Sequence, residues 1–157
     1  MRRFWDLLDR AFELAVAFCF LAIVVVGSLQ VTNRFILNIS LSWSEEFQRY
    51  GQIWLVFLAI PVAYRRSEHI GVDLIHDVLH ARASRALNLF IELLWIVLAA
   101  GILTSTLKLM QFLQFQRSPG LDLRMDLVYG ALVIGPAYML IVALRRIIGM
   151  LLAAEPP

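Results

Sequence analysis

Residues 14–33 read LAVAFCFLAIVVVGSLQVTN, a run of twenty residues that contains no formal charge. Residues 127–144 form a second uncharged run, and residues 87–107 form a third in which Glu92 is the one charged residue. A transmembrane helix needs roughly 20 mostly apolar residues, because each residue rises about 1.5 Å along the helix axis. These three stretches are therefore predicted to cross a membrane as α-helices.

A fourth stretch, residues 43–64, is less apolar because Glu45, Glu46 and Arg49 lie near its start. It can still span if those side chains lie at one interface or against a partner. The composition also indicates a membrane protein: 61% of the 157 residues are hydrophobic and 17% are charged, against roughly 45–50% and about 25% in soluble domains. We expect an all-α integral membrane protein with a single domain over residues 1–157, whose four transmembrane helices cover about 11–33, 43–64, 86–108 and 126–146.

The distribution of basic residues favours four crossings over three. If all four segments cross, one side holds both termini and nine arginines: Arg2, Arg3, Arg10, Arg65, Arg66, Arg82, Arg85, Arg145 and Arg146. The other side then holds five basic residues: Arg34, Arg49, Lys108, Arg117 and Arg124. Cytoplasmic loops carry an excess of Lys and Arg, so this bias predicts that both termini are cytoplasmic. A cleaved signal peptide is the weaker interpretation of the first segment, because its apolar run exceeds the usual length of about 7–15 residues.

The loop between the second and third spans has an amphipathic pattern over residues 69–80. On a helical wheel its polar side chains fall within an arc of roughly 100°, opposite a wide apolar face. These polar residues are His69, Asp73, His76, Asp77 and His80. A helix so divided lies in the plane of the bilayer surface, so we expect an interfacial helix here. Asp73, His76 and His80 have the spacing of zinc ligands, but no general-base glutamate stands between the histidines, and we expect no metal.

Other functional classes lack the residues that they need. The single cysteine, Cys19, excludes a disulfide framework and thiolate clusters. All three histidines lie in the loop, whereas a membrane haem needs axial histidines within the helices. The basic residues are scattered rather than gathered into a stripe, which argues against nucleic acid as a partner. The sequence contains no recognisable nucleophile–base pair, carboxylate dyad or phosphate-binding loop, so we expect no enzymatic activity.

Few polar residues lie within the predicted spans. Glu92 is close enough to the cytoplasmic end of the third span for its carboxylate to reach the headgroups, so snorkelling and a specific function both remain open. In the fourth span, Gly135-Pro136 predicts a kink, and Ala131 with Gly135 forms a small-xxx-small pair suited to close helix contact. The sequence shows no polar pathway through a four-helix bundle.

The start of the second span, Leu41-Ser42-Trp43-Ser44-Glu45-Glu46, carries the signals of a helix start. Ser42 or Ser44 can cap the helix, and acidic residues in the first turn suit the positive end of the helix dipole. Glu45 and Arg49 stand in the favourable i, i+4 order for an ion pair. An ordinary capped helix therefore explains this stretch as well as a site of interaction does.

Three short motifs follow one another along the chain: Q-V-x-x-R-x-x-x-N, S-W-S-E-E and R-R-x-E-H-I-x-V-D. The residues that form them are Gln30, Val31, Arg34 and Asn38; Trp43, Ser44, Glu45 and Glu46; and Arg65, Arg66, Glu68, His69, Ile70, Val72 and Asp73. Their order and spacing resemble the small membrane subunit of tripartite ATP-independent periplasmic (TRAP) transporters, the DctQ-like family. Chain length and four spans match as well, so the resemblance covers essentially the whole chain. The candidate partner-interface residues are Arg34, Trp43, Glu45, Glu46, Arg49, Arg65, Arg66, Glu68, His69 and Asp73.

The resemblance implies a function that the residues alone do not supply. Such a subunit would be an accessory scaffold beside a much larger membrane subunit, which binds sodium ions and the substrate and moves them by an elevator-like motion. A periplasmic binding protein would deliver the substrate, an organic acid such as a dicarboxylate or a sialic acid. The resemblance places the chain in the bacterial inner membrane, in contact with membrane lipid, with no cofactor of its own and with sodium in the large partner.

Two other classes are alternatives. A small autonomous four-helix exporter would need an acidic residue deep in its first span, and residues 14–33 contain none. A membrane-anchor subunit of a redox enzyme would need haem ligands within its helices, where this sequence has no histidine. The proteins that co-purify with the chain in mild detergent would separate these alternatives from the transporter subunit.

Overall fold

The computed structural model describes residues 2–39, 41–66 and 81–152, and most of these are helical. Helix α1 covers Arg2–Thr32 and continues into a π-helical turn, η1 (Asn33–Leu37). The helices that follow are α2 (Ser42–Arg66), α4 (Ala81–Leu113), the short α5 (Met125–Val128) and α6 (Ala131–Leu152). No strand occurs in the described ranges, so the predicted all-α class is confirmed.

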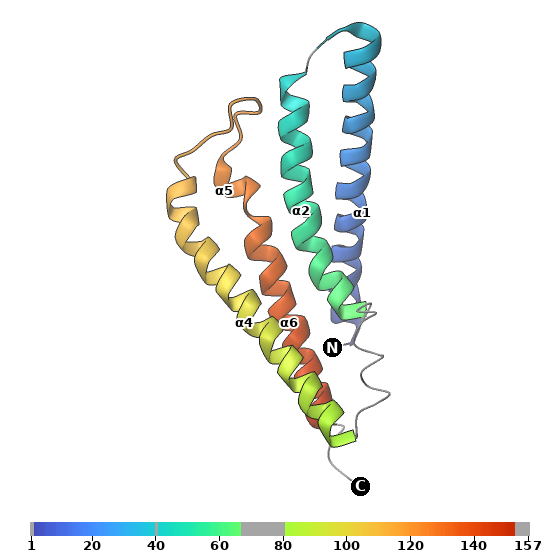
Figure 1. The fold of residues 1–157 in the computed structure, drawn as a ribbon, viewed down its shortest axis with the longest axis vertical. Helices are drawn as coiled ribbons and strands as arrows, with labels where there is room; N and C mark the ends of the chain where they lie inside the picture. Colours follow the sequence, from blue (N-terminus) through green and yellow to red (C-terminus); the bar gives the residue numbers. More distant parts are fainter. Residues whose placement is uncertain (1, 40, 67–80, 153–157) are drawn as a thin grey trace.

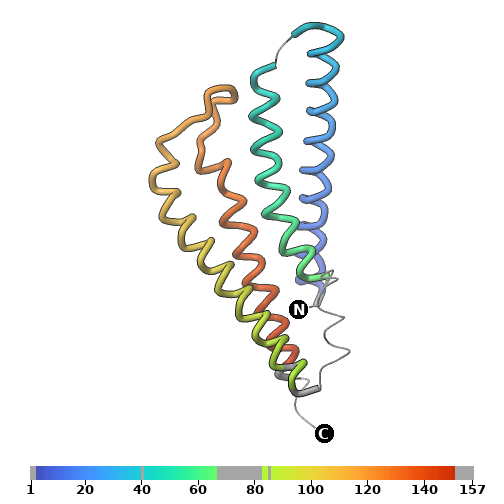
Figure 2. Tube along the Cα trace, in the orientation of Figure 1, coloured from blue at the N-terminus to red at the C-terminus, as the bar shows by residue number. Residues whose placement is uncertain are grey.

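The four long helices lie in a row rather than in a closed bundle (Figure 1). Helix α1 packs on α2, α2 on α6 and α6 on α4, so that α1 and α4 are the outer members of the row. The chain runs up and down between the two ends of this row, and the start of α1 and the end of α6 lie at the same end (Figure 2). We call this the termini end. The opposite end, which holds η1 and residues 114–124, is the loop end.

Three of the helical segments are long and apolar enough to cross a membrane: Arg3–Leu37, Ala86–Leu113 and Met125–Met150. Their apolar surface is largely uncovered by the rest of the chain. Phe18 on α1 is 72% exposed and Val97 on α4 is 62% exposed, for example. Contiguous apolar faces of this kind are not left in contact with water. The chain is therefore a multi-pass membrane protein whose helix faces contact lipid or another membrane subunit.

Helices α2 and α6 approach each other closely at Gly135. A Cβ atom added there would overlap the backbone carbonyl of Phe57 on α2, and Ala131, one turn earlier on α6, is fully buried. The close contact predicted for this small-xxx-small pair is confirmed. Pro136 follows within α6, and the kink expected there stays a prediction.

The buried apolar core lies toward the termini end of the row. It combines residues of α2, α4 and α6 with side chains of α1, so all four long helices meet there. The ring of Phe12 on α1 stacks on that of Tyr138 on α6, with centroids 3.8 Å apart and an interplanar angle of 15°. The buried members are Val62, Tyr64, Ala99, Tyr138, Met139, Val142 and Ala143.

Several predictions concern residues outside the described ranges. The interfacial helix expected over residues 69–80 belongs to these, as do the candidate interface residues Glu68, His69 and Asp73. The same holds for His76 and His80 of the zinc hypothesis. All of these stay predictions.

Candidate functional site

The polar residues of α2 form two groups, one at each end of the helix. At the loop end, the S-W-S-E-E stretch opens α2, and Ser44 is completely buried within it. The Ser44 hydroxyl donates a hydrogen bond to the carbonyl of Leu41, 2.7 Å away. An N-cap side chain would instead accept from a backbone N–H. Of the two serines that could cap the helix, Ser44 therefore does not do so, and its hydroxyl instead fixes the turn by which the chain enters α2. Capping by Ser42 stays a prediction.

Glu46 holds the segment between α4 and α5 in place. Its carboxylate oxygens accept hydrogen bonds from the backbone N–H groups of Gly120 and Leu121, at 2.9 and 3.0 Å. A Cβ atom at residue 120 would lie 2.9 Å from the Glu46 carboxyl carbon, so glycine lets the carboxylate come this close to the backbone without a shift of the Glu46 side chain. Two charge-assisted hydrogen bonds donated to one carboxylate fix both the position and the orientation of the segment. Glu46 thus ties the start of α2 to the segment that connects α4 to α5.

Glu45 faces a different neighbour. It is exposed and accepts a long hydrogen bond of 3.5 Å from the amide of Gln30 on α1, whose oxygen in turn accepts from Gln48. Glu45 and Gln30 border a hollow of about 280 Å³ that is also lined by Arg34. The ion pairs of the described residues do not include the predicted pair of Glu45 with Arg49. The loop end thus presents an exposed carboxylate and exposed arginines beside a polar hollow.

At the termini end, the arginines that close α2 pair with carboxylates of α1. Arg65 contacts Asp9 at 3.3 Å and also pairs with Glu13, and Arg66 contacts Glu13 at 3.1 Å. Asp9 is only 6% exposed. It also accepts a 2.5 Å hydrogen bond from the hydroxyl of Tyr138 on α6. One carboxylate therefore joins α1, α2 and α6.

A second buried carboxylate, Glu92, joins α4 to α6. Glu92 is 3% exposed and one of its oxygens accepts from Arg146 at 3.2 Å, while the other has no hydrogen-bond partner among the described residues. The Arg146 guanidinium also lies over the ring of Tyr64 on α2, 4.6 Å from its centroid. Of the two possibilities left open for Glu92, the structure favours a specific contact over snorkelling, because the carboxylate turns inward to the neighbouring helix.

The termini-end ion pairs form a network that joins the four long helices. Asp9 and Glu92 are buried, but their partners Arg65, Arg145 and Arg146 are 28%, 37% and 26% exposed, so each ion pair contributes modestly, about 0–1 kcal/mol. Together with the hydrogen bond from Tyr138 to Asp9, these contacts favour one relative placement of the helices. We call these residues the termini-end network: Asp9, Glu13, Arg65, Arg66, Glu92, Tyr138, Arg145 and Arg146. Among the described residues, no three His, Cys, Asp or Glu side chains gather as metal ligands would.

Sequence reasoning found some members of these groups and missed others. Arg65, Arg66, Glu45 and Glu46 are candidate residues that the structure places in contacts, and Trp43, which precedes Glu45 and Glu46 in the first turn of α2, is partly buried. The carboxylates that pair with Arg65 and Arg66 were not among the candidate residues. Asp9 and Glu13 are spaced i, i+4 at the end of the chain that the basic residues assign to the same side as Arg65. That shared side was a usable signal for the pairing.

Comparison with known protein families supports the resemblance carried by the motifs. The family model for the DctQ component of tripartite ATP-independent periplasmic transporters matches residues 23–153. The chain is 33% identical over 109 residues to the isethionate TRAP transporter permease protein DctMQ of Oleidesulfovibrio alaskensis. It is 30% identical over 75 residues to the sialic acid TRAP transporter permease protein SiaT of Haemophilus influenzae, and 28% over 82 residues to the sialic acid TRAP transporter small permease protein SiaQ of Vibrio cholerae.

These alignments cover different shares of the proteins compared. They include 68%, 48% and 52% of this chain, in the order given above. They include 17% of DctMQ, 12% of SiaT and 47% of SiaQ. The chain therefore spans less than half the length of each of these relatives.

Proposed function

The chain belongs to the DctQ family of TRAP transporter small permease subunits, and from this premise we propose that it is the scaffold subunit of a binding-protein-dependent secondary transporter. Its partner in the membrane is a large permease subunit that carries the substrate site. The observation on which the scaffold role rests is the termini-end network, which locks four helices into one placement. A helix row held in this way suits a static support against which a mobile subunit moves.

We propose that α2 is the fourth transmembrane segment. Its 25 residues reach about 37 Å at 1.5 Å per residue, which exceeds a hydrocarbon thickness of about 30 Å. Helix α2 is less apolar than its neighbours, but it lies between α1 and α6, so those helices cover part of its surface. Four spans leave both termini on one side. The excess of arginines at that side makes it the cytoplasm, with the interfacial helix over residues 69–80 on its surface.

We further propose that the complex resides in the bacterial inner membrane and imports an organic acid together with sodium ions. The class of substrate is proposed from relatives named for isethionate and for sialic acid, both of which are acids. The sodium and substrate sites then belong to the large subunit, and a periplasmic binding protein delivers the acid.

The loop end would face the periplasm in this topology, and its exposed charges become candidates for contact with other subunits. Arg34 and Glu45 border the polar hollow, and Arg49 lies exposed one turn after Glu45. Charges of this kind at an interface govern association rate and specificity more than affinity. Glu46 has a different role, because both of its oxygens are already used to hold the segment at Gly120 and Leu121.

Uptake of a labelled organic acid tests the proposal. Cells that make the large subunit and the binding protein but lack this chain should lose uptake, and expression of the chain from a plasmid should restore it. Sialic acid, isethionate and a dicarboxylate are tested in parallel so that the substrate class is examined in the same cells. Undiminished uptake of the transported acid without the chain would contradict the scaffold role.

A further inference from the structure

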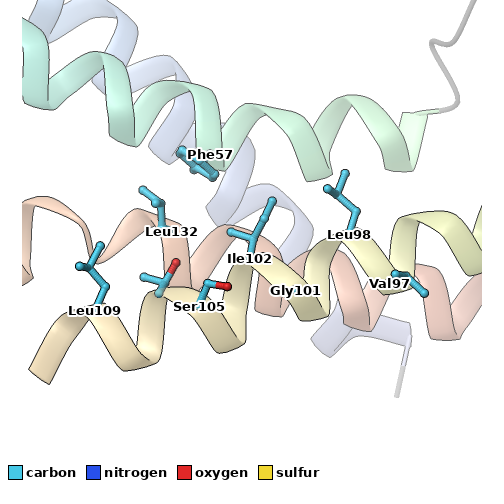
Figure 3. Close-up of a pocket in the computed structure, with 9 residues that line it drawn as sticks. Phe57, Val97, Leu98, Gly101, Ile102, Ser105, Leu109 and Leu132 are labelled. Carbon is cyan, nitrogen blue, oxygen red and sulfur yellow. The ribbon is translucent and has the colours of Figure 1, made fainter.

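A groove opens on the membrane-exposed surface where α4 diverges from α2. It encloses about 660 Å³ and is lined by Phe57 of α2, Leu132 of α6 and one face of α4. Figure 3 shows Leu98 and Ile102 of α4 pointing across this space toward α2, with Phe57 on the opposite wall. Apart from two hydroxyl-bearing residues of α4, Ser105 and Thr106, the lining is apolar.

The two hydroxyl groups in this groove have no hydrogen bond among the described residues, although Thr106 is only 4% exposed. Their neighbour Thr104 behaves as a helix hydroxyl usually does in an apolar setting, because it donates to the carbonyl of Ala100 at 2.8 Å. A hydroxyl group that faces hydrocarbon without a partner is unfavourable, because water does not supply one there. Thr106, which lines the groove, therefore leaves a hydrogen-bonding group open to whatever occupies the groove.

Gly101 lines the same groove one turn before Ser105, and nothing lies within 4 Å of the Cβ atom that another residue would carry there. The packing of this chain therefore gives no reason for a glycine, unlike at Gly135, where a Cβ would overlap Phe57. Gly101 and Ser105 are spaced i, i+4, the small-xxx-small spacing that lets a second helix approach the backbone in a membrane.

We propose that this groove between α2, α4 and α6 seats a transmembrane helix of the large permease subunit, which donates or accepts a hydrogen bond at Thr106. The inference rests on the proposed function, since it names where on the small subunit the large one docks. A lipid acyl chain fills apolar space equally well, but it offers no partner to a hydroxyl and does not need the open glycine. A helix satisfies both features, because its polar side chains and backbone carbonyls can reach the groove once the backbones are close.

Photo-crosslinking in native membranes tests the docking site. The crosslinker p-benzoylphenylalanine replaces Leu98 or Leu109 in the groove, or Leu21 or Val25 on the exposed face of α1 as controls. Adducts are identified by mass spectrometry. We expect adducts with the large permease subunit from the groove positions in clearly higher yield than from α1. Lipid adducts alone, or equal yields at the four positions, would overturn the docking site.

Substitutions measure the contact in the same complex. Gly101→Leu should lower recovery of the large subunit at least about ten-fold, and Thr106→Val about three-fold, as expected for a membrane hydrogen bond of about 0.6 kcal/mol. Gly149→Leu is the matched control, since Gly149 on α6 also has nothing within 4 Å. Gel filtration of each variant alone reports its folding. Unchanged recovery in Gly101→Leu would refute the inference, whereas failure of the wild-type chain to recover any large subunit would refute the proposed function itself.

Discussion

Replacing Asp9 by leucine removes the carboxylate that joins α1 to α2 and α6. The hydrogen bond from Tyr138 ends on a charged acceptor, and bonds of that kind contribute about 1.5–3 kcal/mol. The contacts with Arg65 and Arg145, at 3.3 and 3.5 Å, add less, about 0–1 kcal/mol each, because these arginines are 28% and 37% exposed. We therefore expect Asp9→Leu to destabilise the fold by about 3 kcal/mol, and Asp9→Asn, which keeps an acceptor for Tyr138, by roughly half as much.

The assay is fluorescence-detected gel filtration of the tagged chain after a series of heating steps. For a chain of this size, 1 kcal/mol shifts the melting temperature by about 2–4 °C, so Asp9→Leu should lower it by about 6–12 °C. Asp6→Asn is the matched control, since Asp6 is exposed on the same helix and should change the melting temperature by no more than about 1–2 °C. Equal melting temperatures for Asp9→Leu, Asp6→Asn and the wild type would refute the role assigned to the termini-end network.

Three other predictions follow from the contacts and from the sequence. Glu46→Gln should lower uptake and complex yield more than Glu45→Gln at equal membrane expression, because Glu46 alone accepts two backbone hydrogen bonds; equal effects would contradict this. Gly135→Ala should cost about 1–3 kcal/mol by overpacking against Phe57, whereas Gly149→Ala should leave the melting temperature unchanged; similar melting curves for the two variants would be inconsistent with the packing. With Cys19 replaced, cysteines at positions 74 and 78 should label more slowly from the cytoplasm than those at 73 and 77, and equal rates would exclude the interfacial helix.

The sequence predicts the helices better than it predicts their arrangement. Long apolar runs predict three membrane-crossing helices, because a stretch of about twenty residues with at most one charge has the length and composition of a transmembrane helix. The small-xxx-small pair at Ala131 and Gly135 also predicts a real contact, because a missing side chain allows close approach whatever the partner. The row order α1, α2, α6, α4 depends instead on which apolar faces fit together, and helices that are apolar on several faces do not encode that order in a simple pattern.

For the polar contacts as well, the sequence indicates which residues take part but does not indicate their partners. Glu46 stands out as a motif residue, but its partners are backbone N–H groups at Gly120 and Leu121, and a backbone group has no signature in a sequence. Pro119-Gly120 is typical of a turn, yet nothing in it tells which side chain will reach that turn. Tyr138 and Asp9 lie 129 positions apart, and only the packed helices bring them together.

Affinity purification of the tagged chain from its native membranes tests the central claim most directly, through the mass of the intact particle and the identity of its components. We expect a stable particle that contains this chain and the large permease subunit and that loses the large subunit when the groove is filled by Gly101→Leu. A monodisperse particle that contains this chain alone, together with normal transport by the large subunit in its absence, would contradict the account.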